Sequence, residues 1–300
     1  MLNDTQLVIG ASGLVGQALM RQLSNASGRI IGTYVTQPRG GLITLDMTDA
    51  AALRSCMDAV KPRVIYLSAA LTHVDYCEDH PDEAFKQNAQ GPRLVAEEAA
   101  RIGAKLVFYS TEYVFDGTAG PYDEEAKPNP LSVYGRSKLD AEHAIREILR
   151  DALIVRTTVV YGWDTLSLKK NFAMQVYERV KSGQEMTIPE DQIGNPTLAE
   201  YLAECSIALV ERNVGGVVNV VGKDLVARTD FTRALVKLFG GDTSRVTPIT
   251  TASMKQKAAR PLKGGLRTEK LARLLGRDGL PLDQALEWLD RQRRAEQGEF

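Results

Sequence analysis

The sequence predicts an α/β fold with a doubly wound parallel sheet and a smaller C-terminal lobe. Short apolar runs that suit buried strands alternate with amphipathic helical stretches as far as Asp151, and residues 152–156 add one more strand. A glycine-rich turn joins the first strand to the first helix, which is typical of the Rossmann type. We expect residues 1–158 to form a dinucleotide-binding domain, residues 159–300 to form a substrate-binding lobe, and the segment 192–222 to return to the first domain.

The composition is that of an ordinary soluble protein, with 44% hydrophobic and 25% charged residues in a chain of 300. A net charge of −1 favours neither nucleic acid nor a membrane surface as a partner. Residues 1–6 are polar, unlike a signal peptide, and no run approaches the roughly 20 apolar residues of a membrane span. We therefore expect a cytoplasmic protein.

Cysteine and histidine are few. The three cysteines have no paired spacing and the three histidines have no helical metal-ligand spacing. Reduced thiols and surface histidines are expected, and no metal site.

The first strand, residues 5–9, runs into a turn with three glycines and then a helix that reaches about Ser24. Glycines allow a tight turn and a close approach to a pyrophosphate, and the helix N-terminus offers N–H groups to it. Glycines also serve simple turns, but this position favours a cofactor. The predicted cofactor-binding residues of the turn are Gly10, Ser12, Gly13, Leu14, Val15 and Gly16.

The second strand, residues 29–34, ends without the acidic residue that would bind the ribose 2′-hydroxyl of NAD. The following loop offers Arg39, which could accommodate a 2′-phosphate, although a lone loop arginine is as often solvated. We expect NADP(H) to be preferred, with NAD(H) as the alternative. The next strand, residues 41–45, ends at Asp46, which either contacts the adenine or caps the turn before the helix at residues 50–60.

The fourth strand, residues 63–67, ends in the small residues Ser68, Ala69 and Ala70, which let a flat ligand approach the backbone. The helix that opens at Pro81 contains Asn88 and Gly91-Pro92 in its middle. Because proline removes a helical hydrogen bond, we expect a kink there.

The strand at residues 105–109 is followed by Ser110 and Thr111, whose hydroxyls fall at the carboxyl end of the sheet. After a loop, the helix at residues 131–149 carries Tyr134 and Lys138 one turn apart on one face. An ammonium group favours the phenolate of a neighbouring tyrosine, and a hydroxyl can hold a carbonyl beside the phenol. The arrangement predicts a catalytic set for hydride transfer: Thr111, Tyr134 and Lys138.

A second match to the Tyr-x-x-x-Lys spacing, Tyr177 and Lys181, lies on a charged stretch with no such strand before it. We interpret it as a solvated helix face. The later part of the chain predicts helices at residues 171–182, 198–211, 229–239, 268–275 and 282–293, a strand at 217–221 and a loop at 191–197.

Together these motifs resemble the extended short-chain dehydrogenase/reductase family and, within it, the dTDP-4-dehydrorhamnose reductases. The most specific segments are residues 110–117, 120–122 and 130–139, with support from residues 45–49, 69–75 and 191–197 and from Arg260-Pro261. The resemblance implies that Lys138 also holds the nicotinamide ribose, and that four residues flank the adenosine half of the cofactor: Asp46, Met47, Ala69 and Ala70.

The resemblance also implies a nucleotide-sugar substrate whose 4-keto group is reduced, with Thr111, Glu112 and Arg260 at the substrate. Among the basic residues of the lobe, Lys169, Lys170 and Lys263 are further candidates for a substrate phosphate, although each is as readily a solvated surface residue. Glu112 stands where the family usually has aspartate. Gly264-Gly265 follow Arg260-Pro261 where a polar residue is more usual.

Two alternatives remain open. One is another nucleotide-sugar epimerase or dehydratase, although dehydratases carry two acids after the catalytic threonine, and here Glu112 is followed by Tyr113. The other is a non-catalytic regulatory subunit similar to that of methionine adenosyltransferase. The expected partner is a small molecule, and the sequence leaves a homodimer open.

Overall fold

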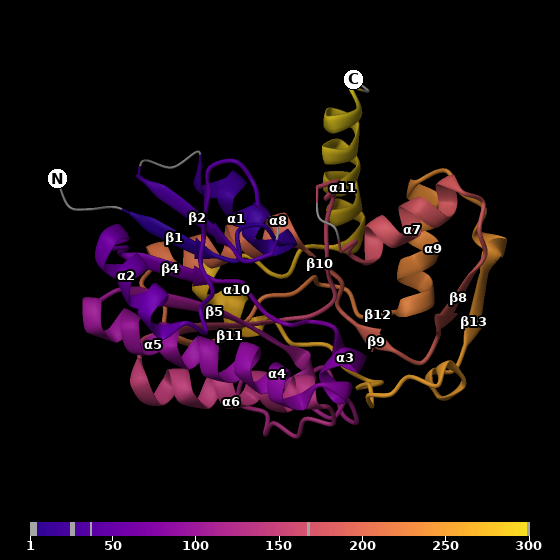
Figure 1. Ribbon diagram of the computed structural model, residues 1–300. Coiled ribbons are helices and arrows are strands. Elements are labelled where there is room, and N and C mark those ends of the chain that lie inside the picture. The colour runs from indigo at the N-terminus through magenta and orange to yellow at the C-terminus, as the bar shows by residue number, and fades with distance from the viewer. Residues whose placement is uncertain (1–4, 25–27, 37, 167–168, 299–300) are drawn as a thin grey trace.

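The computed structural model describes residues 5–24, 28–36, 38–166 and 169–298. Its centre is a seven-stranded parallel sheet in the order β11-β6-β5-β4-β1-β2-β3 (Figure 1). The strands are β1 (Gln6–Ile9), β2 (Ile30–Tyr34), β3 (Leu42–Thr44), β4 (Val64–Leu67), β5 (Lys105–Thr111), β6 (Leu153–Thr157) and β11 (Gly216–Asn219). The predicted doubly wound fold is confirmed.

The strand order reverses between β1 and β4. From β1 the chain adds β2 and β3 on one side, and from β4 it adds β5, β6 and β11 on the other. β1 and β4 pair directly, with Ile9 opposite Leu67, so the segments that follow them leave the sheet side by side. In sheets of this kind, ligands bind outside the carboxyl ends of the strands at this switch point.

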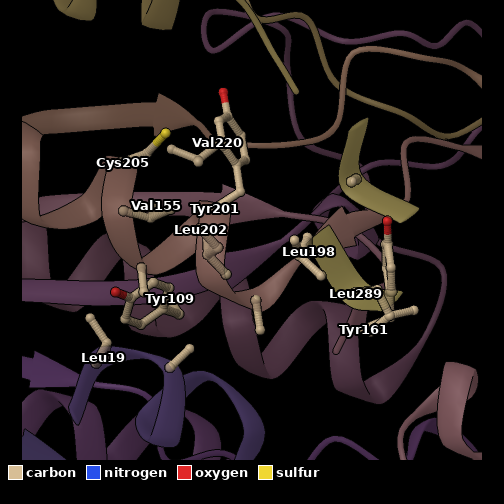
Figure 2. Packing of buried hydrophobic residues seen from close by; sticks show 14 of the residues in the cluster. Leu19, Tyr109, Val155, Tyr161, Leu198, Tyr201, Leu202, Cys205, Val220 and Leu289 are labelled. Atoms are coloured by element: carbon tan, nitrogen blue, oxygen red, sulfur yellow. The ribbon is translucent and has the colours of Figure 1, made fainter. Parts of the chain in front are cut away.

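Helices cover both faces of the sheet. The strands are apolar on both faces: Val107 and Tyr109 of β5 face one core, while Leu106 and Phe108 face the other. One layer contains α1 (Leu14–Leu23), α8 (Ala199–Glu211) and α10 (Glu269–Leu275), and the other contains α2 (Ala50–Val60), α5 (Gly91–Ile102) and α6 (Val133–Ile148). Figure 2 shows α8 side chains packed above Tyr109.

The expected kink is confirmed as a π-helical turn, Lys86–Gln90, between α4 (Pro81–Phe85) and α5. The turn directs Asn88 into the protein, where its side chain is fully buried. Its amide bonds the N–H and the carbonyl of Leu71 and donates to Ser137 on α6. The kink therefore ties the segment after β4 to the helix that carries Tyr134. The sequence did not predict α3 (Val74–Asp79), which precedes α4.

The rest of the chain forms the lobe to the right of the sheet in Figure 1, with the C-terminal helix projecting from the body. Its helices are α7 (Phe172–Lys181), α9 (Arg228–Leu238) and α11 (Leu282–Gln297). Three short strand pairs accompany them: β8 (Met186–Pro189) with β13 (Val246–Ile249), β9 (Ile193–Gly194) with β12 (Val226–Ala227), and β7 (Val160–Tyr161) with β10 (Thr197–Leu198). The predicted loop at residues 191–197 thus contains strand residues, whose partners lie too far away in sequence to give a local pattern.

One interpretation was wrong: Tyr177 does not lie on a solvated face. Its ring packs edge-on against Trp163 at 4.9 Å and Phe239 at 5.2 Å, and its hydroxyl accepts a hydrogen bond from Gln297. Lys181 is exposed, as expected. The aromatic partners come from other segments, so the charged neighbours of Tyr177 in sequence misled the interpretation.

The three cysteines are free thiols, and the three histidines are exposed, as predicted. Among the described helices, none has the length and apolar character needed to cross a membrane. Most of the polar amino terminus and Gln37, in the loop before Arg39, fall outside the described residues.

Candidate active site

A cavity of about 540 Å³ opens at the carboxyl edge of the sheet, against the lobe. The lobe contributes residues 169–172 and Arg228 to its wall. Much of the remaining wall comes from the glycine-rich turn, from the ends of β4, β5 and β6 and from α6. These residues are Ser12, Gly13, Leu14, Val15 and Gly16 of the turn, Ser68, Ala70, Ser110, Thr111 and Thr157 at the strand ends, and Tyr134 and Lys138 of α6. The predicted catalytic set and most of the predicted turn residues thus share one cavity.

Two of the three glycines of the turn are required by close packing of the backbone, and the third leaves open space. Gly10 has a φ of +89°, and a Cβ there would lie 2.6 Å from the amide nitrogen of Ala69; a Cβ on Gly16 would lie 2.2 Å from the Gly10 carbonyl oxygen. A Cβ on Gly13 would meet nothing nearer than 3.5 Å. No side chain caps α1, so its first N–H groups are available to an anion in the cavity.

The hydroxyls of Thr111 and Tyr134 lie close enough for Thr111 to act on the pKa of the phenol. Thr111 ends β5, and Ser132 starts α6 by accepting from the amide of Gly135. The Tyr134 ring packs edge-on against Tyr113, with its centroid 5.6 Å away. Burial raises the pKa of Tyr134 well above its usual value, and the interaction with the Thr111 hydroxyl opposes that rise. The phenol is therefore neutral at pH 7 and holds a proton that it can donate.

Lys138 lies one turn further along α6 and is only 2% exposed. Its ammonium nitrogen lies 4.0 Å from the centre of the Phe108 ring. Burial lowers the pKa of Lys138 to about 7, against the charge of Glu142. The tuning of the Tyr134 phenol by Lys138 therefore stays a prediction.

The family model for the RmlD substrate binding domain matches residues 5–289. The chain belongs to this family. A probable low-salt glycan biosynthesis reductase from Haloferax volcanii is 32% identical over 90% of this chain and 91% of its own length. The beta subunit of methionine adenosyltransferase 2 from Xenopus tropicalis is 31% identical over 81% of this chain and 75% of its own.

The fold agrees with the family. A dTDP-4-dehydrorhamnose reductase from Bacillus anthracis, solved in complex with NADP, superposes with a TM-score of 0.88 at 28% identity, covering 97% of this chain and all of the other. The similarity extends over the sheet and the lobe together.

In this RmlD-family chain, Glu112 does not line the large cavity. Its side chain is buried and accepts a hydrogen bond of 2.7 Å from the amide of Gly265. Burial raises the pKa of Glu112 to about 7, against this bond and the charge of Arg228. The carboxyl thus holds the Gly264-Gly265 segment, and it also lines a small neighbouring cavity together with Arg228. Its role in substrate binding stays a prediction.

Arg260, the predicted phosphate ligand, also lies outside the cavity walls. Its guanidinium pairs with Asp75 at 3.0 Å and donates to the carbonyl of Ala258. Asp75 in turn accepts from the Ala258 amide. The arginine therefore fastens the segment before Pro261 to α3. Lys169 and Lys170 do line the large cavity.

The cation that the sequence interpretation missed is Arg228, the first residue of α9. It lines the 540 Å³ cavity and also a neighbouring cavity of about 470 Å³ in the lobe, and Phe172 borders both as well. Its guanidinium lies 4.7 Å from the centre of the Phe172 ring, and within the described chain no carboxylate pairs with it. Burial lowers the pKa of Arg228, while the nearby Tyr113 and Glu112 raise it.

Four of the residues predicted to bind the cofactor do not line the cavity. Asp46 accepts from the amide and hydroxyl of Thr48, which is the capping alternative. Met47 is buried beneath Gly91, Ala69 packs on Gly10, and Arg39 is half-buried. Their roles toward a cofactor stay predictions. Thr36, from the loop after β2, lines the cavity instead.

Proposed function

We propose that this chain reduces the 4-keto group of a nucleotide-linked deoxysugar with a nicotinamide cofactor. The observation that carries the proposal is the single cavity shared by the glycine-rich turn, Thr111, Tyr134 and Lys138. Its volume of about 540 Å³ is that of a small-molecule site. The similarity to a dTDP-4-dehydrorhamnose reductase that binds NADP supports both the reaction and the substrate class.

The residues present fit a dinucleotide. Gly13 and the uncapped start of α1 suit a pyrophosphate, and they lie at the switch point between β1 and β4. The Lys138 ammonium donates no hydrogen bond to any described residue, which leaves it available to ribose hydroxyls. When bound, the nicotinamide supplies the hydride.

The chain's own residues complete the reduction. Thr111 and Tyr134 hold the carbonyl oxygen between their hydroxyls, which polarises the C=O bond. As the carbon receives the hydride, the Tyr134 phenol transfers its proton to the oxygen, so that the carbonyl becomes an alcohol. The phenolate that remains is reprotonated from solvent before the next turnover.

NADP(H) is the cofactor that we propose, with NAD(H) as the alternative. β2 ends at Tyr34 with no carboxylate to repel a 2′-phosphate. Arg39, in the loop that follows β2, is the cation predicted to accommodate that phosphate. The prediction is that kcat/KM for NADPH at least equals that for NADH. A clear preference for NADH would contradict it.

The nucleotide part of the substrate suits the second cavity. A diphosphate needs local cations in a chain whose net charge is −1. Arg228 stands at the wall common to both cavities and has no carboxylate partner among the described residues. A sugar in the first cavity and a nucleoside in the second would therefore place the diphosphate at Arg228.

Two other functions compete. A dehydratase of the same fold would need a second acid for the elimination, but Glu112 is followed by Tyr113, is bonded to Gly265 and stands outside the large cavity. An epimerase stays an open alternative. A regulatory subunit is favoured by the similarity to the methionine adenosyltransferase beta subunit. The complete set of Thr111, Tyr134 and Lys138 favours the reductase.

Absorbance at the NADPH band decides between these functions. Purified protein is mixed with NADPH and a dTDP-4-keto-6-deoxy-L-sugar. Loss of absorbance that depends on the sugar supports the reductase. Binding of NADPH without turnover of any keto sugar would support the regulatory subunit instead.

A further inference from the structure

Glu142 lies at the centre of a buried polar cluster just behind the proposed catalytic set. It lies one turn after Lys138 on α6, and its side chain is 1% exposed. One carboxylate oxygen, Oε1, accepts from Ser110 Oγ and from Arg156 Nε at 2.9 Å, and Oε2 accepts from Arg156 Nη2 at 2.6 Å. The pair with Arg156 is therefore bidentate and almost completely removed from water.

The cluster joins three elements whose ends form the cavity wall. Ser110 directly precedes Thr111 on β5, and Arg156 is its partner in the register of β6, one residue before Thr157. Arg156 also donates to the carbonyl of Glu124, and its guanidinium lies 5.1 Å from the Phe115 ring. One carboxylate thus links the end of β5, the end of β6 and the helix that carries Tyr134 and Lys138.

We propose that Glu142 is a positioning residue: it fixes Thr111 relative to Lys138, and its negative charge keeps the Lys138 ammonium protonated beneath the cofactor. The inference rests on the proposed function, since it concerns the same hydride-transfer site. Glu142 touches neither substrate nor cofactor, because it does not line the cavity. It acts through Lys138 and through Ser110.

The negative charge of Glu142 acts on Lys138 in one direction: it favours the charged ammonium over the neutral amine. Lys138 and Glu142 are four residues apart on one helix face, the spacing at which opposite charges attract. Elements packed against α6 carry other ionisable groups. They are Asp75, Tyr76, Cys77, Glu78 and Asp79 on α3, Asp82 and Glu83 on α4, Lys86 on the π-helical turn, Arg93, Glu97, Glu98 and Arg101 on α5, Lys105 and Tyr109 on β5, and Glu112 and Tyr113 on the 3-10 turn Glu112–Val114. Of these groups and Arg156, none appears with Glu142 among the causes that shift the pKa of Lys138.

If Glu142 and Arg156 only stabilised the fold, replacing both would leave the pH dependence of NADPH binding unchanged. Removing one partner of a buried pair is strongly destabilising, whereas replacing both partners is often tolerated. The informative variants are therefore Glu142→Gln combined with Arg156→Gln, which removes both charges, and Arg156→Gln alone, which leaves the negative charge. Glu142→Asp keeps the charge but is too short to reach Ser110 and Arg156 together.

The test is the dissociation constant of NADPH from pH 6 to 9, measured by its fluorescence, with thermal unfolding to confirm the fold. In the wild type, affinity for NADPH should fall as pH rises through about 7, the pKa of Lys138. In the double variant the midpoint should move down by about one pH unit, the effect of losing one neighbouring opposite charge. In Arg156→Gln it should stay or move up. Glu142→Asp should keep the midpoint while kcat falls about tenfold through misplacement of Thr111.

If the double variant folds and its NADPH binding has the wild-type pH midpoint, the role of the charge is overturned. If the double variant does not fold, a downward shift of the midpoint in Arg156→Gln overturns it. Wild-type kcat in Glu142→Asp overturns the positioning role. Failure of the proposed function itself would appear earlier, as no NADPH binding or no turnover in the wild type. The two failures are therefore distinguishable.

Discussion

The Lys138 ammonium lies against the face of the Phe108 ring, 4.0 Å from its centre, in a site that is almost closed to water. The aromatic face offers a cation only part of the stabilisation that water would, so the charge is maintained at a cost. Among the described residues, none accepts a hydrogen bond from this ammonium. A cofactor hydroxyl would therefore be its first hydrogen-bond acceptor.

This contact predicts a pH dependence for cofactor binding. Because burial lowers the pKa of Lys138 to about 7, the side chain is an ammonium below that pH and an amine above it. NADPH affinity should therefore fall as pH rises from 6 to 8. In Lys138→Met the affinity should be weak and level across this range. A fall in the Met variant as steep as in the wild type would assign the titration to another group.

The glycine-rich turn predicts a contrast between two matched substitutions. Gly16→Ala forces its Cβ to within 2.2 Å of the Gly10 carbonyl oxygen, so it should lower the unfolding temperature or prevent folding. Gly13→Ala has room and should fold normally, but its methyl group faces the proposed pyrophosphate site and should weaken NADPH binding about tenfold or more. Calorimetry with and without NADPH checks both. Equal unfolding temperatures for the two variants would contradict this reading of the turn.

The two arginines predict another contrast. Arg228→Gln should raise the dissociation constant of dTDP about tenfold to a hundredfold, because a hydrogen bond to a charged group contributes about 1.5 to 3 kcal/mol. NADPH binding should barely change. Arg260→Gln, which breaks the pair with Asp75, should instead lower the unfolding temperature and affect dTDP less. Titration calorimetry separates them, and the reverse pattern would restore Arg260 as the phosphate ligand.

Sequence patterns were sufficient where the signal is local. The strand that ends at Thr111 and the helix with Tyr134 and Lys138 follow from apolar spacing and end signals, and so do the strand–turn–helix unit at Gly10 and the kink beside Asn88. Each of these signals depends on residues that lie within about one helix or strand of one another along the chain. The structure adds the distances and the burial.

What the sequence could not predict depends on partners far away along the chain. Three strands of the sheet, β5, β6 and β11, lie between Asp75 and Arg260 in sequence. No local pattern could therefore show that the cation expected at the substrate is paired with α3. Arg228 follows two small apolar residues at a helix start, and nothing local marks it as buried. Its role emerges only when α9 and α7 bring Arg228 and Phe172 together.

The central claim is that Tyr134 donates the proton during carbonyl reduction, and the turnover of Tyr134→Phe with NADPH and a dTDP-4-keto-6-deoxy-L-sugar tests it most directly. The substitution removes the hydroxyl that interacts with Thr111 and leaves the ring packed against Tyr113. We expect kcat to fall about 10² to 10⁴-fold with cofactor affinity nearly intact, while Tyr177→Phe keeps normal turnover. Wild-type turnover in Tyr134→Phe would contradict the account.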